Sequence, residues 1–207
     1  MSASRFSVYQ GALRLCGERR LSSITEDRKP RYLLDDAWDN DGVLTCLEAG
    51  QWRFAMRAVE LTYSSDFTPP FGYQYAFEKP DDLVRVCGVC SDEHFDIPLL
   101  RYVDEGDYWF ADITNIYVRY VSNDNEFGFD FAKWPPSFTR YVEAYLASKI
   151  VADLTGDEKK EAKILGLLDQ YLITARANDA MKEPTRFFPQ GSWISARMGR
   201  TDRENGR

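Results

Sequence analysis

The sequence has few of the groups on which enzyme active sites depend. His94 is the only histidine in 207 residues, so catalysis by a histidine base would have to centre on it. It lies among acidic residues in a polar stretch, where a solvated loop histidine is the simpler interpretation. Neither glycine-rich phosphate-binding pattern occurs, and the G-x-S-x-G elbow of hydrolases is also absent. The residues therefore give no positive sign of an enzyme.

Long hydrophobic runs and an excess of positive charge are missing as well. No apolar run approaches the roughly 20 residues that span a bilayer, and residues 1–6 lack the apolar core of a signal peptide. We expect no contact with a membrane and synthesis in the cytoplasm. With 33 acidic against 26 basic residues, the net charge of −7 opposes general affinity for nucleic acid or anionic membranes.

Cysteines are few, and the four present are expected to be free, mostly buried thiols. They are Cys16, Cys46, Cys87 and Cys90. Cys87, Cys90 and His94 form a C-x2-C-x3-H string that could offer three zinc ligands. The string lacks a clear fourth ligand, and residues three apart in a strand point to opposite faces. A small metal-binding or ligand-binding protein, possibly enzymatic, remains the alternative interpretation.

Two further groups of residues have both a functional and a structural interpretation. The acids could suggest a hard-cation site, but they lack calcium-loop spacing, and a solvated helix face explains them more simply. The aromatic residues could suggest a stacking platform, although alternating aromatics are more often sheet core. The acids are Asp35, Asp36, Asp39 and Asp41, and the aromatics are Trp52, Phe54, Tyr73, Tyr75 and Phe77.

Apolar residues three and four apart predict helices on both sides of a central β region. The first helix should span 7–19 with Ser7 as N-cap, and the second 31–49, with an interruption or kink near Gly42. After Pro135 and Pro136, a third helix with Ser137 as N-cap should end by Gly156. A fourth should begin at Asp157, reach Met181, and form an antiparallel hairpin with the third.

Alternating apolar residues and β-branched runs predict strands between these helices. The expected strands lie at 52–56, 73–77, 83–89, 97–103, 108–113 and 116–121. Lys79 to Asp82 indicates a turn, and Asp104 to Asp107 a hairpin turn. We expect the strands to form one meandering antiparallel sheet.

The predicted fold class is α+β, an antiparallel helical bundle with an inserted antiparallel β-sheet domain and an extended C-terminal tail. The expected units are N-terminal bundle helices at 1–50, the β domain at 51–134, a helical hairpin at 135–183 and the tail at 184–207. The tail holds prolines and glycines that exclude a continuous helix, but it also holds apolar residues. Its charge is +3 against −10 for residues 1–183, so we expect it to dock on a neighbouring subunit.

Five short motifs occur in a characteristic order and spacing along the chain. They are Trp52-Arg53-Phe54-Ala55, Tyr75-Ala76-Phe77-Glu78-Lys79-Pro80-Asp81-Asp82-Leu83, Val118-Arg119-Tyr120-Val121, Leu146-Ala147 and Gly191-Ser192-Trp193-Ile194-Ser195-Ala196-Arg197. In these motifs the chain resembles, over roughly residues 8–198, the head-to-tail adaptors of short-tailed bacteriophages, also called tail tubular protein A.

This resemblance implies a structural virion protein without a cofactor. The family forms a homo-oligomeric ring of twelve copies between the portal protein and the next tail ring, the nozzle or tail tubular protein B. DNA would pass through the lumen without specific binding. Trp and Arg are common anchors of interfaces, so we expect the tail to bind the portal or a neighbouring subunit. The expected contact residues are Phe187, Phe188, Trp193, Ile194, Arg197 and Arg200.

Overall fold

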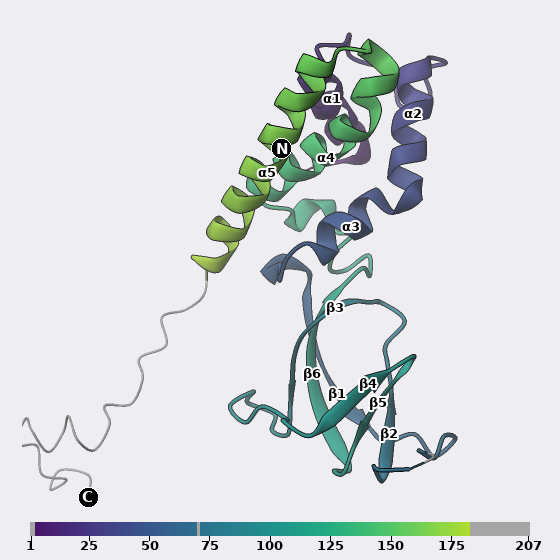
Figure 1. The fold of residues 1–207 in the computed structure, drawn as a ribbon, viewed down its shortest axis with the longest axis vertical. Helices are drawn as coiled ribbons and strands as arrows, with labels where there is room; N and C mark the ends of the chain where they lie inside the picture. The colour runs from purple at the N-terminus through teal and green to yellow at the C-terminus, as the bar shows by residue number, and fades with distance from the viewer. Residues whose placement is uncertain (1–2, 70, 183–207) are drawn as a thin grey trace, which may run out of the picture.

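The computed structural model describes residues 3–69 and 71–182, which form a helical part and a β part joined end to end (Figure 1). The helices are α1 (Arg5–Cys16), α2 (Lys29–Ala37), α3 (Val43–Glu48), α4 (Pro136–Thr155) and α5 (Glu158–Ala180). The strands β1 to β6 all lie between α3 and α4 in the sequence. The α+β class is therefore confirmed.

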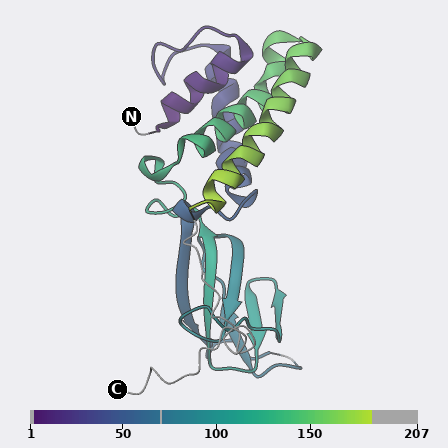
Figure 2. The same cartoon turned by 90° about the vertical axis from the view of Figure 1, so that its left-hand side faces the viewer.

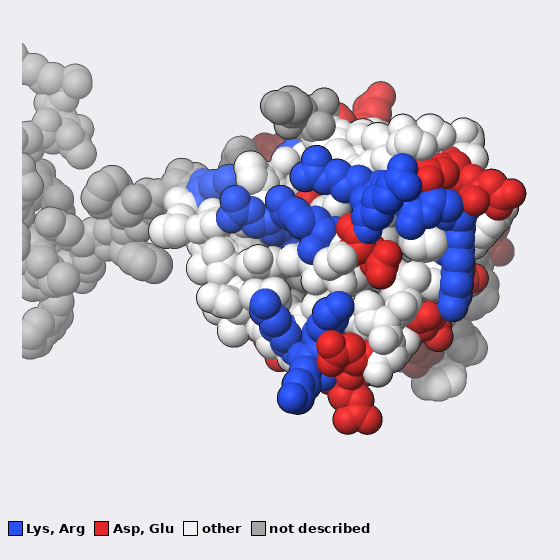
Figure 3. All heavy atoms as spheres, turned by 90° about the horizontal axis from the view of Figure 1, so that it is seen from above, with Lys and Arg blue, Asp and Glu red and all other residues white. Residues whose placement is uncertain are grey.

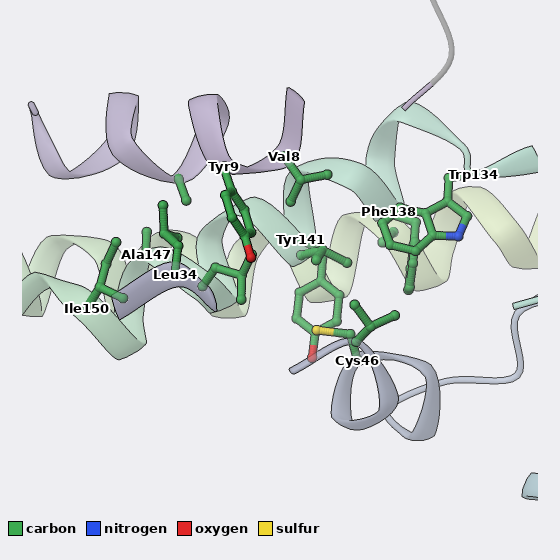
Figure 4. Close-up of a cluster of buried hydrophobic side chains, with 14 of the residues drawn as sticks. Val8, Tyr9, Leu34, Cys46, Trp134, Phe138, Tyr141, Ala147 and Ile150 are labelled. Atoms are coloured by element: carbon green, nitrogen blue, oxygen red, sulfur yellow. The ribbon is translucent and has the colours of Figure 1, made fainter. Parts of the chain in front are cut away.

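Helix α4 is the centre of the helical part, since it contacts α1, α2, α3 and α5 (Figures 1 and 2). Its buried side chains meet those of the surrounding helices in one continuous core (Figure 4). Members from different helices include Val8, Leu34, Cys46, Phe138 and Ile150. Only the two-residue link of Gly156 and Asp157 separates α4 from α5, so the two helices run antiparallel.

The helix ends agree with the sequence prediction at one junction and differ at two. Gly156 ends α4 in the left-handed conformation, and the Asp157 side chain caps α5, as predicted. Helix α1, however, starts one turn earlier than expected, because Ser4 is its N-cap and Ser7 completes a reciprocal capping box. The Ser137 cap is also wrong, since α4 already starts at Pro136, where a missing N–H has no cost.

The predicted interruption near Gly42 is confirmed as a π-helical turn over Trp38–Gly42, between α2 and α3. The wider turn lets the Trp38 ring reach the core, where it packs edge-on against Tyr9 with ring centroids 5.8 Å apart. Gly42 allows this path, because a β-carbon there would collide with the carbonyl oxygen of Ala37.

The strands form two three-stranded antiparallel sheets, so the prediction of a single meander is wrong. One sheet has the order β1-β6-β3, with strands Met56–Thr62, Asn115–Ser122 and Leu83–Cys90. The other has the order β2-β5-β4, with strands Tyr75–Glu78, Tyr108–Ala111 and Tyr102–Glu105. The first strand pairs with the last along its whole length, from Met56 opposite Val121 to Thr62 opposite Asn115.

Two predicted strands differ in detail. Residues Arg53–Ala55 form a 3-10 turn, and β1 begins only at Met56, because Trp52 and Phe54 both pack against Phe138 in the helical core. Residues 97–101 form a loop with one isolated bridge at Pro98, and β4 starts at Tyr102. The predicted hairpin turn is present between β4 and β5.

The β part has a hydrophobic core separate from that of the helices. It is centred on Phe77 and Trp109, both fully buried, which bring the second sheet against the first. The first sheet reaches the helical core at one end, through Val121 of the central strand β6 and the half-buried Val84 and Cys87 of β3. Of the helices in residues 3–69 and 71–182, none has the combination of length and hydrophobicity needed to cross a membrane.

Candidate interaction surfaces

The predicted anchor residues of the tail all lie outside the described residues. This applies to Phe187, Phe188, Trp193, Ile194, Arg197 and Arg200, and to the whole predicted tail at 184–207. The surfaces considered below therefore belong to the helical and β parts.

The Cys87, Cys90 and His94 string does not converge on a common point. Cys87 is half-buried beside the helical core, whereas Cys90 is buried at the end of β3. The His94 side chain is 76% exposed in the following loop. Burial raises the pKa of both thiols, which disfavours the thiolate that binds metal. Among residues 3–69 and 71–182, no group of three His, Cys, Asp or Glu side chains could hold a metal ion.

The aspartates of α2 include the centre of a polar network, which corrects the expectation of a solvated face. Asp35 accepts hydrogen bonds from Arg5 at 2.9 Å, Tyr9 at 2.8 Å and Arg31 at 2.6 Å. These bonds join α1 to α2 at a half-buried position. Asp36 is exposed and accepts only a bond from Asn40, at 2.9 Å. This arrangement favours a structural role over a cation site.

Four of the five aromatic residues, all but Tyr73, are divided between the two cores, as expected for core residues. Trp52 and Phe54 lie about Phe138, with ring centroids 4.9 and 4.8 Å from it. Phe77 is buried in the β part, and Tyr75 packs there against Tyr63 at 4.9 Å. The two groups do not form a common stacking platform.

A polar joint connects the helical part to the β part, and the sequence analysis did not single out its residues. The guanidinium groups of Arg85 and Arg176 donate to the carbonyl oxygens of Glu48 and Ala49, at 2.8 and 3.0 Å. They thereby satisfy carbonyls at the end of α3 that no helical N–H can reach. Asp179 is buried beside them and accepts the backbone N–H of Arg53 at 3.0 Å. These contacts couple β3 and α5 to the same helix end.

Large apolar side chains are exposed on two loops of the β part. Phe71 is 85% exposed on the loop before β2, and Leu100 is 90% exposed on the loop before β4. Nearby, the Phe67 ring stacks on Tyr108 with centroids 4.6 Å apart. Apolar side chains as exposed as Phe71 and Leu100 are candidates for contact with a partner.

Helix α5 and its C-cap also expose large apolar side chains, at Leu165, Ile173 and Met181, which at about 3.6 residues per turn spread over nearly half of the helix circumference. These side chains are 47%, 67% and 75% exposed. Although α5 has 23 residues, its buried residues are only Ile164, Ala175 and Asp179. Leu168, Tyr171 and Leu172 are partly buried against the helical core, whereas Leu165 and Ile173 are left exposed in the monomer.

Charge is unevenly distributed along the molecule. The β region, residues 51–134, holds seven basic and fifteen acidic residues, a net charge of −8. At the opposite end of the molecule, lysines and arginines gather on the helical part (Figure 3). Exposed members there include Arg19 and Arg20 after α1 and Lys159 and Lys160 in the first turn of α5. Residues 1–50 and 135–183 together carry a net charge of −2, so the β region is the more acidic of the two parts.

No family model and no curated protein matches the chain.

Proposed function

We propose that this chain is a structural protein of a bacteriophage virion, the subunit of the head-to-tail adaptor ring that connects the portal to the tail nozzle. The observation that carries the proposal is the presence of separate exposed apolar surfaces, one on α5 and one on the β loops. A ring subunit held between two other rings needs lateral contacts and axial contacts at the same time. An enzyme monomer has no such need.

The positions of the resemblance motifs also support this role. Trp52 and Phe54 lie where the chain leaves the helical part, and Asp82 joins three strands at the base of the β part. Ala147 and Leu146 are fully buried in the central helix. The motifs thus occupy positions that determine how the two parts are joined, which is what an assembly protein must preserve.

In this proposal the helices form the antiparallel bundle, residues 51–134 form the inserted domain, and residues 184–207 dock on the portal or a neighbouring subunit. Twelve copies would surround a channel through which DNA passes without specific binding. The acidic β part would contribute to a tail-side channel wall that repels the phosphate backbone. The basic end of the helices would then face the portal.

The test is negative-stain imaging together with mass photometry of the full chain, alone and mixed with the portal ring of the same phage. We expect rings, or portal complexes of ring stoichiometry. A chain ending at Glu183 should lose portal binding but keep its fold, as measured by circular dichroism. A full chain that stays monomeric and never joins the portal would overturn the proposal.

A further inference from the structure

The first sheet has two edge strands, β1 and β3, and they differ in how well their outer sides are protected. Two register shifts interrupt the pairing of β3 with β6, and the following loop bonds to the outer side of β3, where the Leu99 N–H donates to the Val89 carbonyl at 2.9 Å. Strand β1 pairs with β6 over seven residues without a shift and contains no proline. In Figure 2 it is the blue strand at the side of this sheet. Regular, uncovered edges are the places where further strands add.

The free backbone groups of β1 follow from its pairing with β6. The Tyr63 N–H donates to the Thr114 carbonyl at 3.3 Å, in the same register as the strand before it. Hydrogen-bonded pairs alternate along an antiparallel ladder, so the odd-numbered residues bond to β6 and the even-numbered ones face away from it. The Ser64 N–H accordingly donates to Ala76 of β2, at 2.7 Å. Three residues of β1 present outward N–H and C=O groups to which no other described residue bonds. They are Ala58, Glu60 and Thr62.

A groove of about 910 Å³ follows this free edge. We call it the β1 groove and define it by Arg57 and residues 59–65 on one side and residues 78–82 on the other. Val59 and Leu61 line it and are partly buried against the core of the β part, so the groove offers apolar contacts. An extended segment in this groove can bond to β1 through its main chain and place every second side chain against the apolar wall. This is recognition by strand addition.

The β1 groove is acidic. Five acidic and two basic side chains line it. Both basic groups are already paired, Arg57 with Asp82 at 2.9 Å and Lys79 with Asp104 at 2.5 Å. The other four acids have no basic partner in residues 3–69 and 71–182, and they are Glu60, Glu78, Asp81 and Asp124. The charge of the groove therefore favours a basic extended segment as its occupant.

The chain contains a segment of this kind in its last 25 residues, 183–207, which follow the described part. Residues 192–198 are seven residues without proline or glycine, the length of β1, and their apolar members alternate at Ile194, Ala196 and Met198. The net charge of 184–207 is +3. Helix α5 ends near the start of β1, since Met56 and Ala180 line one cavity. From there 25 residues span at most about 80 Å, which is enough to reach an adjacent copy.

We infer that residues 192–198 of one copy add as a strand to the free edge of β1 in the next copy. This inference rests on the proposed function and names the surface on which the tail docks. The alternating apolar side chains of the segment would face Val59 and Leu61, while its arginines lie against the unpaired acids. Each copy gives one segment and accepts one, so the contact is heterologous and links copies into a ring. A segment bound to its own copy would link no subunits.

The experiment uses two full-length variants, under the conditions in which the unaltered chain forms rings. Ala58→Pro removes an outward N–H and leaves the ladder with β6 intact, which is the position where an edge strand accepts proline. Ser195→Pro interrupts the donating segment. Neither variant alone should form rings. A mixture retains one intact contact, between the groove of the Ser195→Pro chain and the segment of the Ala58→Pro chain, so mass photometry should show two-chain complexes that grow no further.

The matched controls are Ala58→Val and Ser195→Ala, which keep the N–H at the same positions and should form normal rings. Glu78→Lys combined with Asp81→Lys is a second groove variant that leaves the backbone of β1 unchanged. Both side chains are exposed, so this chain should unfold at the urea midpoint of the unaltered chain. Its rings should nevertheless be weakened, because the groove then repels the arginines.

A labelled peptide of residues 190–201 tests the groove separately from the ring. At a concentration where the full chain is monomeric, fluorescence anisotropy should show that the peptide binds. Binding to the Ala58→Pro chain should be about tenfold or more weaker, the effect of losing main-chain hydrogen bonds. The Ala58→Val chain should bind the peptide as the unaltered chain does.

The outcomes that would overturn the inference differ from the one that would overturn the function. Normal rings from Ala58→Pro and Ser195→Pro would show that the segment binds elsewhere, with the adaptor function intact. Defective variants whose mixture gives no two-chain complex would show that the segment binds its own copy. If the unaltered chain forms no ring with or without the portal, the proposed function fails. Peptide binding weakened by Ala58→Pro would then still support strand addition at β1, and equal binding by Ala58→Pro and Ala58→Val would overturn it.

Discussion

Asp82 connects three strands through a single side chain. It lies in the turn before β3 and accepts hydrogen bonds from Arg57 on β1 at 2.9 Å and from Tyr120 and Ser122 on β6 at 2.9 and 2.5 Å. Burial alone would raise the pKa of this carboxyl, but the hydrogen bonds and the nearby guanidinium outweigh it and lower the pKa. The carboxylate is therefore the form that holds the strands together.

Replacement of Asp82 by Asn should lower the free energy of unfolding by about 2 kcal/mol at pH 7, the usual cost of weakening charged hydrogen bonds. Because its folded pKa is depressed, Asp82 stabilises the fold fully above the unfolded value of about 3.9. That contribution is lost as the pH falls through the folded pKa. Urea unfolding at pH 7 and at lower pH should show the two chains converging in acid.

The control for this measurement is Asp81→Asn, an exposed neighbour in the same turn. It should change stability by less than about 0.5 kcal/mol. A difference between Asp82→Asn and the unaltered chain that stays constant with pH would contradict the account.

The sequence predicted individual residues well where the signal is local and poorly where it depends on distant partners. Gly156 and Asp157 were placed correctly, because a helix end is decided within a few residues. Asp35 was expected to be solvated, since its partners Arg5 and Tyr9 lie some 30 residues away. A carboxylate that binds across two helices resembles a surface acid when only its own helix is considered.

At the scale of elements, the helices and most strands follow from periodicity, but the order of strands in the sheets does not. Alternation identifies a strand without identifying its partner. Strand β1 pairs with β6, and the other four strands lie between them in the sequence, so no local pattern identifies the pair. The connection at 63–74 leads the chain from the first sheet to the second. The same limit applies to surfaces. Leu165 and Ile173 lie outside the apolar stripe of α5, and this position is the sign in the sequence that their side chains are exposed.

The connection between β6 and α4 is an ordered element of its own. The Gly128 N–H donates to the Ser122 carbonyl at 3.1 Å, and the Trp134 indole N–H donates to the Gly128 carbonyl at 2.8 Å. Phe131 and Trp134 then pack edge to face, with centroids 5.0 Å apart. A β-carbon on Gly128 would overlap the carbonyl oxygen of Ser122, so only glycine fits.

Gly128→Ala should therefore destabilise the chain by about 2 kcal/mol, in the range expected for overpacking against rigid backbone. Denaturant unfolding followed by tryptophan fluorescence is the measurement, because Trp134 reports on this connection. Gly166→Ala is the matched control: a β-carbon there meets no atom within 4 Å. That change should stabilise α5 by roughly 0.5–1 kcal/mol. Equal effects of the two substitutions would show that Gly128 has no special packing role.

In residues 3–69 and 71–182 the protein has two hydrophobic cores and one narrow connection between them. The chain enters the β part at Met56 and leaves it beside the paired residue Val121. Contacts across the joint involve few side chains, chiefly Val84 and Cys87 against the helical core and Arg85 on the end of α3. Most of the contacts that stabilise the helical part are therefore made among its own helices.

Replacing residues 57–120 by a short Gly-Ser linker should leave a helical protein that still unfolds cooperatively, with reduced stability. The linker can be short because paired residues in antiparallel strands lie about 5 Å apart. Circular dichroism and urea unfolding provide the measurement. Loss of the cooperative transition would mean that the helical core depends on the β part. Leu34→Ala in the shortened chain is the control: it should lower the stability further if the remaining core is specifically packed.

The insertion of the strands between α3 and α4 also determines the order of folding during synthesis. Helix α1 rests on α4, which the ribosome produces more than 100 residues later. At the usual rate of translation this delay is about ten seconds. The β part is complete once β6 emerges, so it can fold first and bring the ends of α3 and α4 together. Until α4 emerges the apolar faces of α1 and α2 are uncovered, and in this interval the nascent chain exposes surface that is prone to aggregate.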